Sequence, residues 1–272
     1  MEASQITFTR YLYDKTEVKH SLFLSILQHN IHESLFWGYE LYYSGFEEEA
    51  FEFITLILNT IYKDSCSFIQ SYYDEMVEKW NTDNNPIYFG NLIATLCTKK
   101  YDLKQFCKEY LKVEGVQKEE RPKNVLIVEL HDDYINEFKT KHSSKIYHTL
   151  KDNCIYPVHK NINNLFNISR PDYKQVKTNY YEHWLYYASF SPIWKERILQ
   201  FQGIVNHDTK HVDFINDECM ETFYAHFGFE PDEQSTETQE KIIGKKNIKQ
   251  TTIKEFCKEF HFQLLIKIKK RT

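Results

Sequence analysis

Through most of residues 1–113, hydrophobic residues recur at the three- and four-residue spacing of amphipathic helices. This spacing predicts helices over residues 15–28, 32–44, 47–62, 65–80, 86–99 and 102–113. Ser44 and Gly45 should end the second helix, because glycine readily takes the left-handed conformation found after many helices. Successive helices of similar length indicate a helical-hairpin array, irregular and HEAT-like, in this half of the chain.

The second half of the chain has a more mixed pattern. Residues 114–124 are polar and contain Gly and Pro, so we predict a linker there, followed by a mixed, mostly helical domain over 125–229. The apolar run at 124–130 (NVLIVEL) is typical of a short buried strand, and residues 203–215 alternate around a turn, which indicates a β-hairpin. Further helices are expected near residues 144–153, 172–189, 192–201 and 216–227.

The end of the chain divides by charge. Residues 230–240 are acidic and polar and are predicted to form a mobile loop, and 241–272 form a basic C-terminal segment with a helix near 251–261. The last ten residues alternate apolar and basic side chains, as in a terminal strand or a frayed end. The predicted fold class is therefore mainly α, with a small β-hairpin or minor sheet in the C-terminal half.

Composition supports this fold class. Only 7 Gly and 6 Pro occur in 272 residues, too few for a many-stranded sandwich or barrel, and 42% hydrophobic residues argue against disorder. The 6 cysteines form no CxxC pair, which disfavours a structural zinc site. We see no signal peptide and no apolar run long enough to cross a membrane, so we expect a cytoplasmic protein with free thiols and no membrane partner.

Charge is unevenly distributed. The net charge of −5 gives no general reason to expect nucleic-acid binding, but residues 241–272 hold ten Lys and Arg against two Glu, a local charge of +8. One interpretation is a solvated basic end that is docked on the acidic remainder of the chain. The other is a set of phosphate-binding residues, comprising Lys245, Lys246, Lys249, Lys267, Lys269, Lys270 and Arg271.

Two helices are dense in aromatic residues. Tyr and Trp bury an apolar body and keep a polar edge, which suits both protein cores and protein interfaces. The alternatives are core packing and an exposed protein-binding surface built on Trp37, Tyr42, Tyr43, Trp184 and Tyr187. Next to the first cluster, the triplet Glu47–Glu49 falls in the first turn of a helix, where the helix dipole favours acidic residues without any catalytic role.

The sequence contains no GxGxxG, P-loop, GxSxG or HExxH motif. The strongest acid/base candidates are His131, Asp132 and Asp133 after the apolar run, and His207 with His211 have the spacing of a possible metal pair. Both patterns are also typical of ordinary polar turns. We therefore assign no catalytic residue, no metal ligand and no cofactor.

Three stretches carry a resemblance to other proteins. SLFWGYELYYSGFEEEAFEF (34–53), ASFSPIWKERI (188–198) and FYAHFGFEPDEQ (223–234) are similar in style to uncharacterised proteins of nucleocytoplasmic large DNA viruses of the mimivirus kind. The resemblance implies a viral protein that works in the host cytoplasm or is packaged in the virion, and it implies no activity and no site residue.

We predict a non-enzymatic protein–protein interaction scaffold or adaptor. The helical hairpins and aromatic helices favour this function, and no catalytic motif opposes it. The alternative is a nucleic-acid-associated factor of viral transcription, replication or translation that uses the basic C-terminal segment. A third possibility is an enzyme whose acidic and histidine site follows no known motif.

Overall fold

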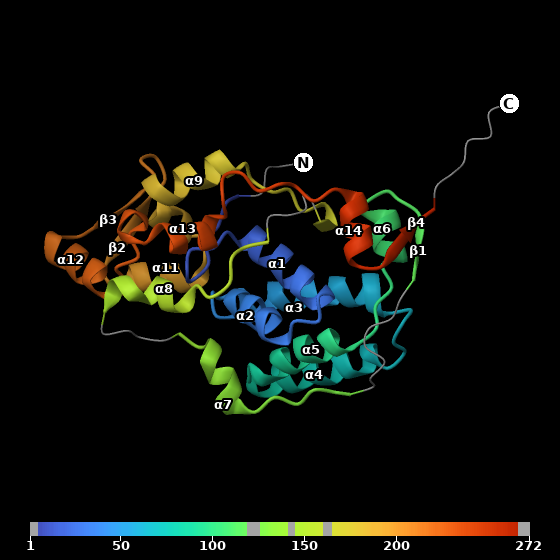
Figure 1. Ribbon diagram of the computed structural model, residues 1–272. Helices are drawn as coiled ribbons and strands as arrows, with labels where there is room; N and C mark the ends of the chain where they lie inside the picture. Colours follow the sequence, from blue (N-terminus) through green and yellow to red (C-terminus); the bar gives the residue numbers. More distant parts are fainter. Residues whose placement is uncertain (1–4, 119–125, 141–144, 160–164, 266–272) are drawn as a thin grey trace.

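The computed structural model describes residues 5–118, 126–140, 145–159 and 165–265. Helices form most of the regular structure in these residues, and the strands form two antiparallel pairs (Figure 1). This confirms the mainly α fold class with a minor sheet. Long helices dominate because the apolar side chains recur with a helical period and few Gly or Pro interrupt them.

The N-terminal half consists of packed helices, as predicted. Its elements are α1 (Lys15–Leu27), α2 (Ile31–Tyr42), α3 (Glu47–Ile57), the π-helical turn η1 (Leu58–Tyr62), α4 (Ile69–Asp83), α5 (Ile87–Thr98) and α6 (Lys104–Glu109). Helix α1 packs along α2 as a hairpin, α2 packs on α5, and α5 packs on α4. Side chains on nearly every face of α1 and α2 are buried, so this pair forms the centre of the molecule (Figure 1).

Local sequence signals fix the ends of these helices. The Asp14 carboxylate accepts hydrogen bonds from the backbone N–H groups of Thr16 and Glu17, which caps α1. Gly45 follows α2 with a φ of +87°, and a Cβ at this position would lie 2.5 Å from the Pro192 side chain. Glycine is therefore required by both the backbone conformation and the close approach of the C-terminal half.

The apolar run at 124–130 is not a buried strand, so this prediction was wrong. Its described residues form no regular secondary structure, and Leu126 and Ile127 are 64% and 46% exposed. An apolar run becomes a buried strand only when other strands pair with it and layers cover both of its faces. No described strand lies beside this run.

Residues 126–130 instead lie along α5 and are held by its polar side chains. The backbone N–H of Val128 donates to Thr95 Oγ1 at 3.1 Å, and that of Leu130 donates to Asn91 Oδ1 at 2.8 Å. Asn91 and Thr95 are one helical turn apart and share a face of α5. Side chains of a helix thus satisfy the backbone groups that a neighbouring strand would otherwise satisfy.

The segment predicted as a linker includes strand β1 (Gly115–Gln117). It pairs antiparallel with β4 (Phe262–Leu264), so two segments far apart in the sequence lie side by side. Helix α14 (Ile253–Glu259) leads into β4 and buries Phe256 and Cys257. The first part of the basic C-terminal segment is therefore docked on the N-terminal helices. The final residues, 266–272, lie outside the described residues.

The C-terminal half contains shorter elements. They are α7 (Asp132–Ile135), η2 (Asn136–Phe138), η3 (Ile146–His148), α8 (Thr149–Asn153), η4 (Leu165–Asn167), α9 (Tyr173–Glu182), α10 (Trp184–Ala188), α11 (Pro192–Gln200), α12 (Asp217–His226), η5 (Pro231–Glu233) and α13 (Thr236–Ile243). The predicted hairpin is confirmed as β2 (Gly203–Asn206) and β3 (His211–Phe214).

Two predictions in this half need correction. The helix expected over 172–189 is divided into α9 and α10 at His183, whose backbone leaves the helical region at φ −141° and ψ 30°. The acidic loop expected at 230–240 contains η5 and the start of α13. Ser235 caps α13 by accepting the N–H of Thr238, and burial of Ile242 and Ile243 holds the helix in place.

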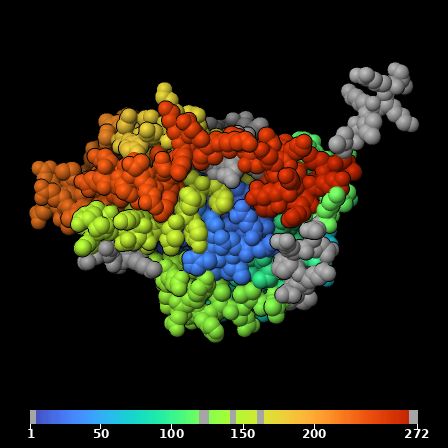
Figure 2. Space-filling view, viewed as in Figure 1, coloured from blue at the N-terminus to red at the C-terminus, as the bar shows by residue number. Residues whose placement is uncertain are grey.

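Both sides of the predicted boundary share one hydrophobic core. The N-terminal residues ahead of α1 lie between the two halves, where the Trp194 Nε1–H donates to the carbonyl of Thr9 at 3.0 Å. The Tyr13 hydroxyl donates to the carbonyl of Tyr156 at 2.8 Å. Figure 2 shows blue atoms of the N-terminal part of the chain lying on this face between red C-terminal and green middle segments.

Candidate functional site

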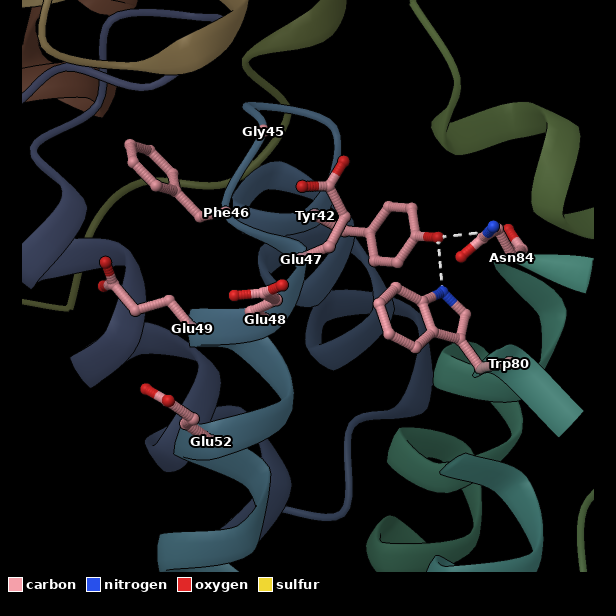
Figure 3. A pocket seen from close by; sticks show the side chains of 9 residues that line it. All are labelled: Tyr42, Gly45, Phe46, Glu47, Glu48, Glu49, Glu52, Trp80 and Asn84. Atoms are coloured by element: carbon pink, nitrogen blue, oxygen red, sulfur yellow. Dashed lines mark hydrogen bonds between the residues drawn. The ribbon is translucent and has the colours of Figure 1, made fainter. Parts of the chain in front are cut away.

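A cavity of about 600 Å³ opens between the start of α3 and the end of α4 (Figure 3). Its wall combines a run of glutamates with two aromatic rings that are held by hydrogen bonds. The lining residues are Tyr42, Gly45, Phe46, Glu47, Glu48, Glu49, Glu52, Trp80 and Asn84. We call this cavity the acidic pocket.

The helix start explains why the glutamates gather here. Glu47, Glu48 and Glu49 occupy the first turn of α3, as predicted, where unpaired backbone N–H groups favour negative charge. Glu52 lies one turn further along α3 than Glu48, so both side chains can face the same opening. In Figure 3 the Glu47 carboxylate lies beside the Tyr42 ring, whereas Glu49 points away.

Two lysines of α1 balance the negative charge of Glu49. Its carboxylate receives Lys15 Nζ at 2.9 Å and also binds Lys19. Burial alone would raise the pKa of Glu49, but the hydrogen bonds and charges of Lys19 and Lys15 outweigh it and lower the pKa. Glu47, Glu48 and Glu52 form no ion pair with any residue that the structure describes. The acidic pocket therefore keeps three uncompensated carboxylates.

The aromatic wall is held by hydrogen bonds. Trp80 Nε1–H donates to the Tyr42 hydroxyl at 2.8 Å, and that hydroxyl donates to the carbonyl of Asn84 at 3.3 Å. The Trp80 ring also packs on Phe51, with ring centroids 4.7 Å apart. Burial raises the pKa of Tyr42, and the negative charge of Glu47 raises it further. The phenol therefore stays neutral and serves as a hydrogen-bonding wall.

The chemistry of the acidic pocket favours a cationic group. Carboxylates attract a Lys or Arg side chain, and the face of a tryptophan or tyrosine ring attracts the same cation through its quadrupole. The protein already shows one such contact beside the pocket, where Lys15 Nζ lies 4.5 Å from the Phe46 ring centroid.

The five aromatic residues predicted to bind a partner lie in different environments. Trp37 is completely buried and donates to Glu33 Oε1 at 3.2 Å, so in this structure it belongs to the core. Trp184 is 7% exposed and packs against Trp194. Tyr43 is half-buried, with the Arg10 guanidinium over its ring.

Tyr42 is the member of this set that lines the acidic pocket. The residue is 6% exposed, so only a small part of it faces the opening. Tyr187 is half-buried and lines a separate, smaller cavity. The structure therefore does not bring the predicted residues together on one surface, and docking of a partner on them stays a prediction.

The basic residues predicted to bind nucleic acid are only partly described. Lys245, Lys246 and Lys249 are exposed after α13. Lys245 Nζ lies 3.6 Å from a Glu240 carboxylate oxygen, and Lys249 Nζ lies 2.9 Å from one of Glu255. One of these contacts joins the basic segment to the acidic stretch before it, and the other lies within the segment. The remaining predicted residues, Lys267, Lys269, Lys270 and Arg271, lie outside the described residues.

The acid/base candidates are dispersed. His131, Asp132 and Asp133 are exposed at the start of α7, and His207 and His211 flank the turn of the β2–β3 hairpin. Within the described ranges, no three His, Cys, Asp or Glu side chains converge as a metal site. Nothing in this arrangement adds to the enzyme hypothesis.

The sequence pattern indicated the glutamates of this pocket but not the hydrogen bond between Trp80 and Tyr42. The two residues are far apart in the chain and belong to helices that are not consecutive. A weak signal exists, since Trp80 and Asn84 are one turn apart at the end of a helix. It could not indicate which aromatic ring lies opposite.

A scan against protein-family models and searches of curated proteins and of solved structures find no match for this chain. In the part of the chain that the structure describes, no helix is both long enough and apolar enough to cross a membrane. The geometry of the acidic pocket is therefore the main guide to function.

Proposed function

We propose that this chain is a non-enzymatic protein-interaction module, and that the acidic pocket binds a basic segment of a partner protein. The observation that carries the proposal is the combination of three uncompensated carboxylates with the Tyr42 and Trp80 rings around one opening. A ligand with several positive charges would pair with Glu47, Glu48 and Glu52. A volume of about 600 Å³ accommodates one or two long side chains.

The rigidity of the wall supports the same function. Because Tyr42 is bonded to both Trp80 and Asn84, binding a cation would not require these side chains to become ordered first. Charged contacts of this kind give a fast, salt-sensitive association with modest affinity. Such binding suits an adaptor that holds a partner reversibly.

The partner is best sought in the setting that the sequence resemblance suggests. If the chain is a protein of a mimivirus-like virus, candidates are basic proteins of the infected cell or of the virus particle. Co-purification of the tagged protein with and without nuclease separates a protein partner from one bridged by nucleic acid.

Isothermal titration calorimetry with a short peptide of alternating arginine and lysine tests the proposal directly. The triple variant E47Q/E48Q/E52Q should weaken binding at least tenfold, because it removes three negative charges without changing side-chain shape. The matched control E196Q/E218Q/E221Q removes three exposed carboxylates elsewhere and should retain most of the affinity. Equal loss in both triple variants would show that only net charge matters and would refute a specific pocket.

The nucleic-acid alternative needs a different variant. Truncation at residue 240 would remove α14 and β4, which bury Phe256 and pair with β1, and would therefore disturb the fold. The triple variant K245E/K246E/K249E reverses exposed charges and keeps both elements. Loss of binding to a single-stranded oligonucleotide in this variant, together with unchanged peptide binding, would favour the alternative.

A further inference from the structure

A second cavity has a volume of about 290 Å³. It is lined by elements of the C-terminal half and by the N-terminal residues before α1. Helix α9 contributes Gln175 and Asn179, α10 contributes Tyr186 and Tyr187, and the turn between β2 and β3 contributes Lys210. We call it the amide pocket, after Asn179.

The break at His183 builds this cavity. Gln175 and Asn179 are one turn apart on α9 and face the same side. The chain leaves the helical region at His183, and the two tyrosines of α10 that follow line the same cavity. The backbone N–H of Phe8 donates to the carbonyl of Tyr187 at 3.2 Å and fixes the N-terminal residues against α10.

Asn179 is the feature that points to a ligand. Its side chain is 6% exposed, it lines the cavity, and its Nδ2 has no hydrogen-bond partner among the described residues. Buried amide groups are nearly always hydrogen-bonded, so an unpaired one at the wall of a cavity calls for an acceptor. A ligand carrying an acceptor oxygen would supply it.

The charges around the amide pocket favour an anion. Arg170 and Lys210 line it, and no described carboxylate does. The charge of Arg170 is already balanced, because its Nη2 lies 3.1 Å from Glu17 and also donates to the carbonyl of His159 at 2.7 Å. Lys210 is exposed at the turn and pairs with no carboxylate in the described part of the chain. The excess positive charge is therefore that of Lys210.

The tyrosines supply an apolar wall made of two rings that stand nearly at right angles to each other. The rings of Tyr186 and Tyr187 meet edge to face, with centroids 5.1 Å apart. Tyr187 is half-buried, and its hydroxyl makes no hydrogen bond to a described residue. A planar group of a ligand could pack on one of these rings while its anionic end reaches Asn179 and Lys210.

We propose that the amide pocket binds a small organic anion, a carboxylate or a phosphate monoester attached to a planar ring. Asn179 and the Tyr187 hydroxyl donate to its oxygens, Lys210 neutralises its charge, and the tyrosine rings cover its planar part. The volume lies near the lower end of small-molecule sites, which excludes a large cofactor. This site is separate from the acidic pocket and has the opposite charge preference.

Ligand-observed NMR and calorimetry with four probes test the proposal. Benzoate and phenyl phosphate combine a ring with an anion, benzamide is the neutral ring, and inorganic phosphate is the anion alone. We expect millimolar binding of benzoate or phenyl phosphate, and the tighter of the two identifies the head group. Failure of both to bind at 10 mM would overturn the proposal, as would equally tight binding of benzamide.

Variants locate the binding. Lys210→Met and Asn179→Leu should each weaken the anion about tenfold, because each removes a hydrogen bond to a charged group. The matched control Lys195→Met removes an exposed lysine from α11 and should leave the affinity unchanged. Because the Asn179 amide has no described partner for its Nδ2, Asn179→Leu should fold with unchanged stability. Affinity that is insensitive to both changes, or equally reduced by the control, would place the anion elsewhere and refute the assignment.

Discussion

Arg10 and Glu40 form an ion pair in the interior of the molecule. Arg10 Nε donates to Glu40 Oε2 at 2.8 Å, and the two side chains are 2% and 0% exposed. The other carboxylate oxygen accepts the backbone N–H of Tyr11 at 3.1 Å, and Arg10 Nη2 donates to the carbonyl of Phe138 at 2.7 Å. This pair joins the N-terminal residues, α2 and η2.

Removing one charge of this pair should be strongly destabilising. Glu40→Gln leaves the Arg10 guanidinium buried without a counter-charge, and we expect the free energy of unfolding to fall by about 3–5 kcal/mol. The double variant R10M/E40L removes both charges and should cost less than Glu40→Gln alone. Urea denaturation followed by circular dichroism measures both values. A loss below about 0.5 kcal/mol in Glu40→Gln would contradict a buried pair.

Stability should decline below about pH 6.5 because of His20. Burial is the main reason that the pKa of His20 lies well below its usual 6.5, and the positive charge of Arg170 lowers it further. In this pH range the unfolded chain binds a proton that the folded chain does not, so stability present above pH 6.5 is lost as pH falls, by at most about 1.4 kcal/mol per unit. His20→Gln should flatten this part of the profile, measured by urea denaturation from pH 5 to 8. The control His131→Gln changes an exposed histidine and should leave the pH profile of stability unchanged. Identical profiles in the wild type, His20→Gln and His131→Gln would refute the role of His20.

The segment 126–130 should open without global unfolding. Thr95→Val and Asn91→Leu each remove one acceptor of its backbone, at a cost of about 1 kcal/mol, which corresponds to roughly fivefold faster exchange. Hydrogen exchange with mass spectrometry should show this change at Val128 and Leu130 and not in α2. The control Thr82→Val changes an exposed threonine of α4 and should leave the exchange rates of Val128 and Leu130 unchanged. Uniformly faster exchange throughout the protein would instead indicate that the segment is part of the cooperative core.

The cysteines should react in two groups. Cys219 and Cys66 are half-buried, and burial raises the pKa of the Cys66 thiol, so Cys219 should react first with a maleimide. The slow group is buried and consists of Cys97, Cys107, Cys154 and Cys257. A time course by intact mass spectrometry in native buffer should show the fast step, and Cys219→Ser should abolish it. Early modification of Cys97 would show that α5 opens readily.

Much of the fold followed from periodicity and local signals. The breaks at Gly45 and Pro192 and the β2–β3 hairpin were all predictable, because each depends on residues close together in the chain. The glutamates at the start of α3 were predictable for the same reason. The apolar run at 124–130 was misjudged because its backbone partners, Asn91 and Thr95, belong to a distant helix.

By itself, the sequence determined the helical character of this protein, the approximate positions of its N-terminal helices and the sites of its charge clusters. These properties depend on side-chain period and on capping within one turn.

Only the tertiary structure decided that Trp37 is buried, that Tyr42 meets Trp80 beside the glutamates, and that Asn179 faces a cavity. Burial and cavities arise from packing between segments distant in the chain, and no local pattern specifies which segments meet.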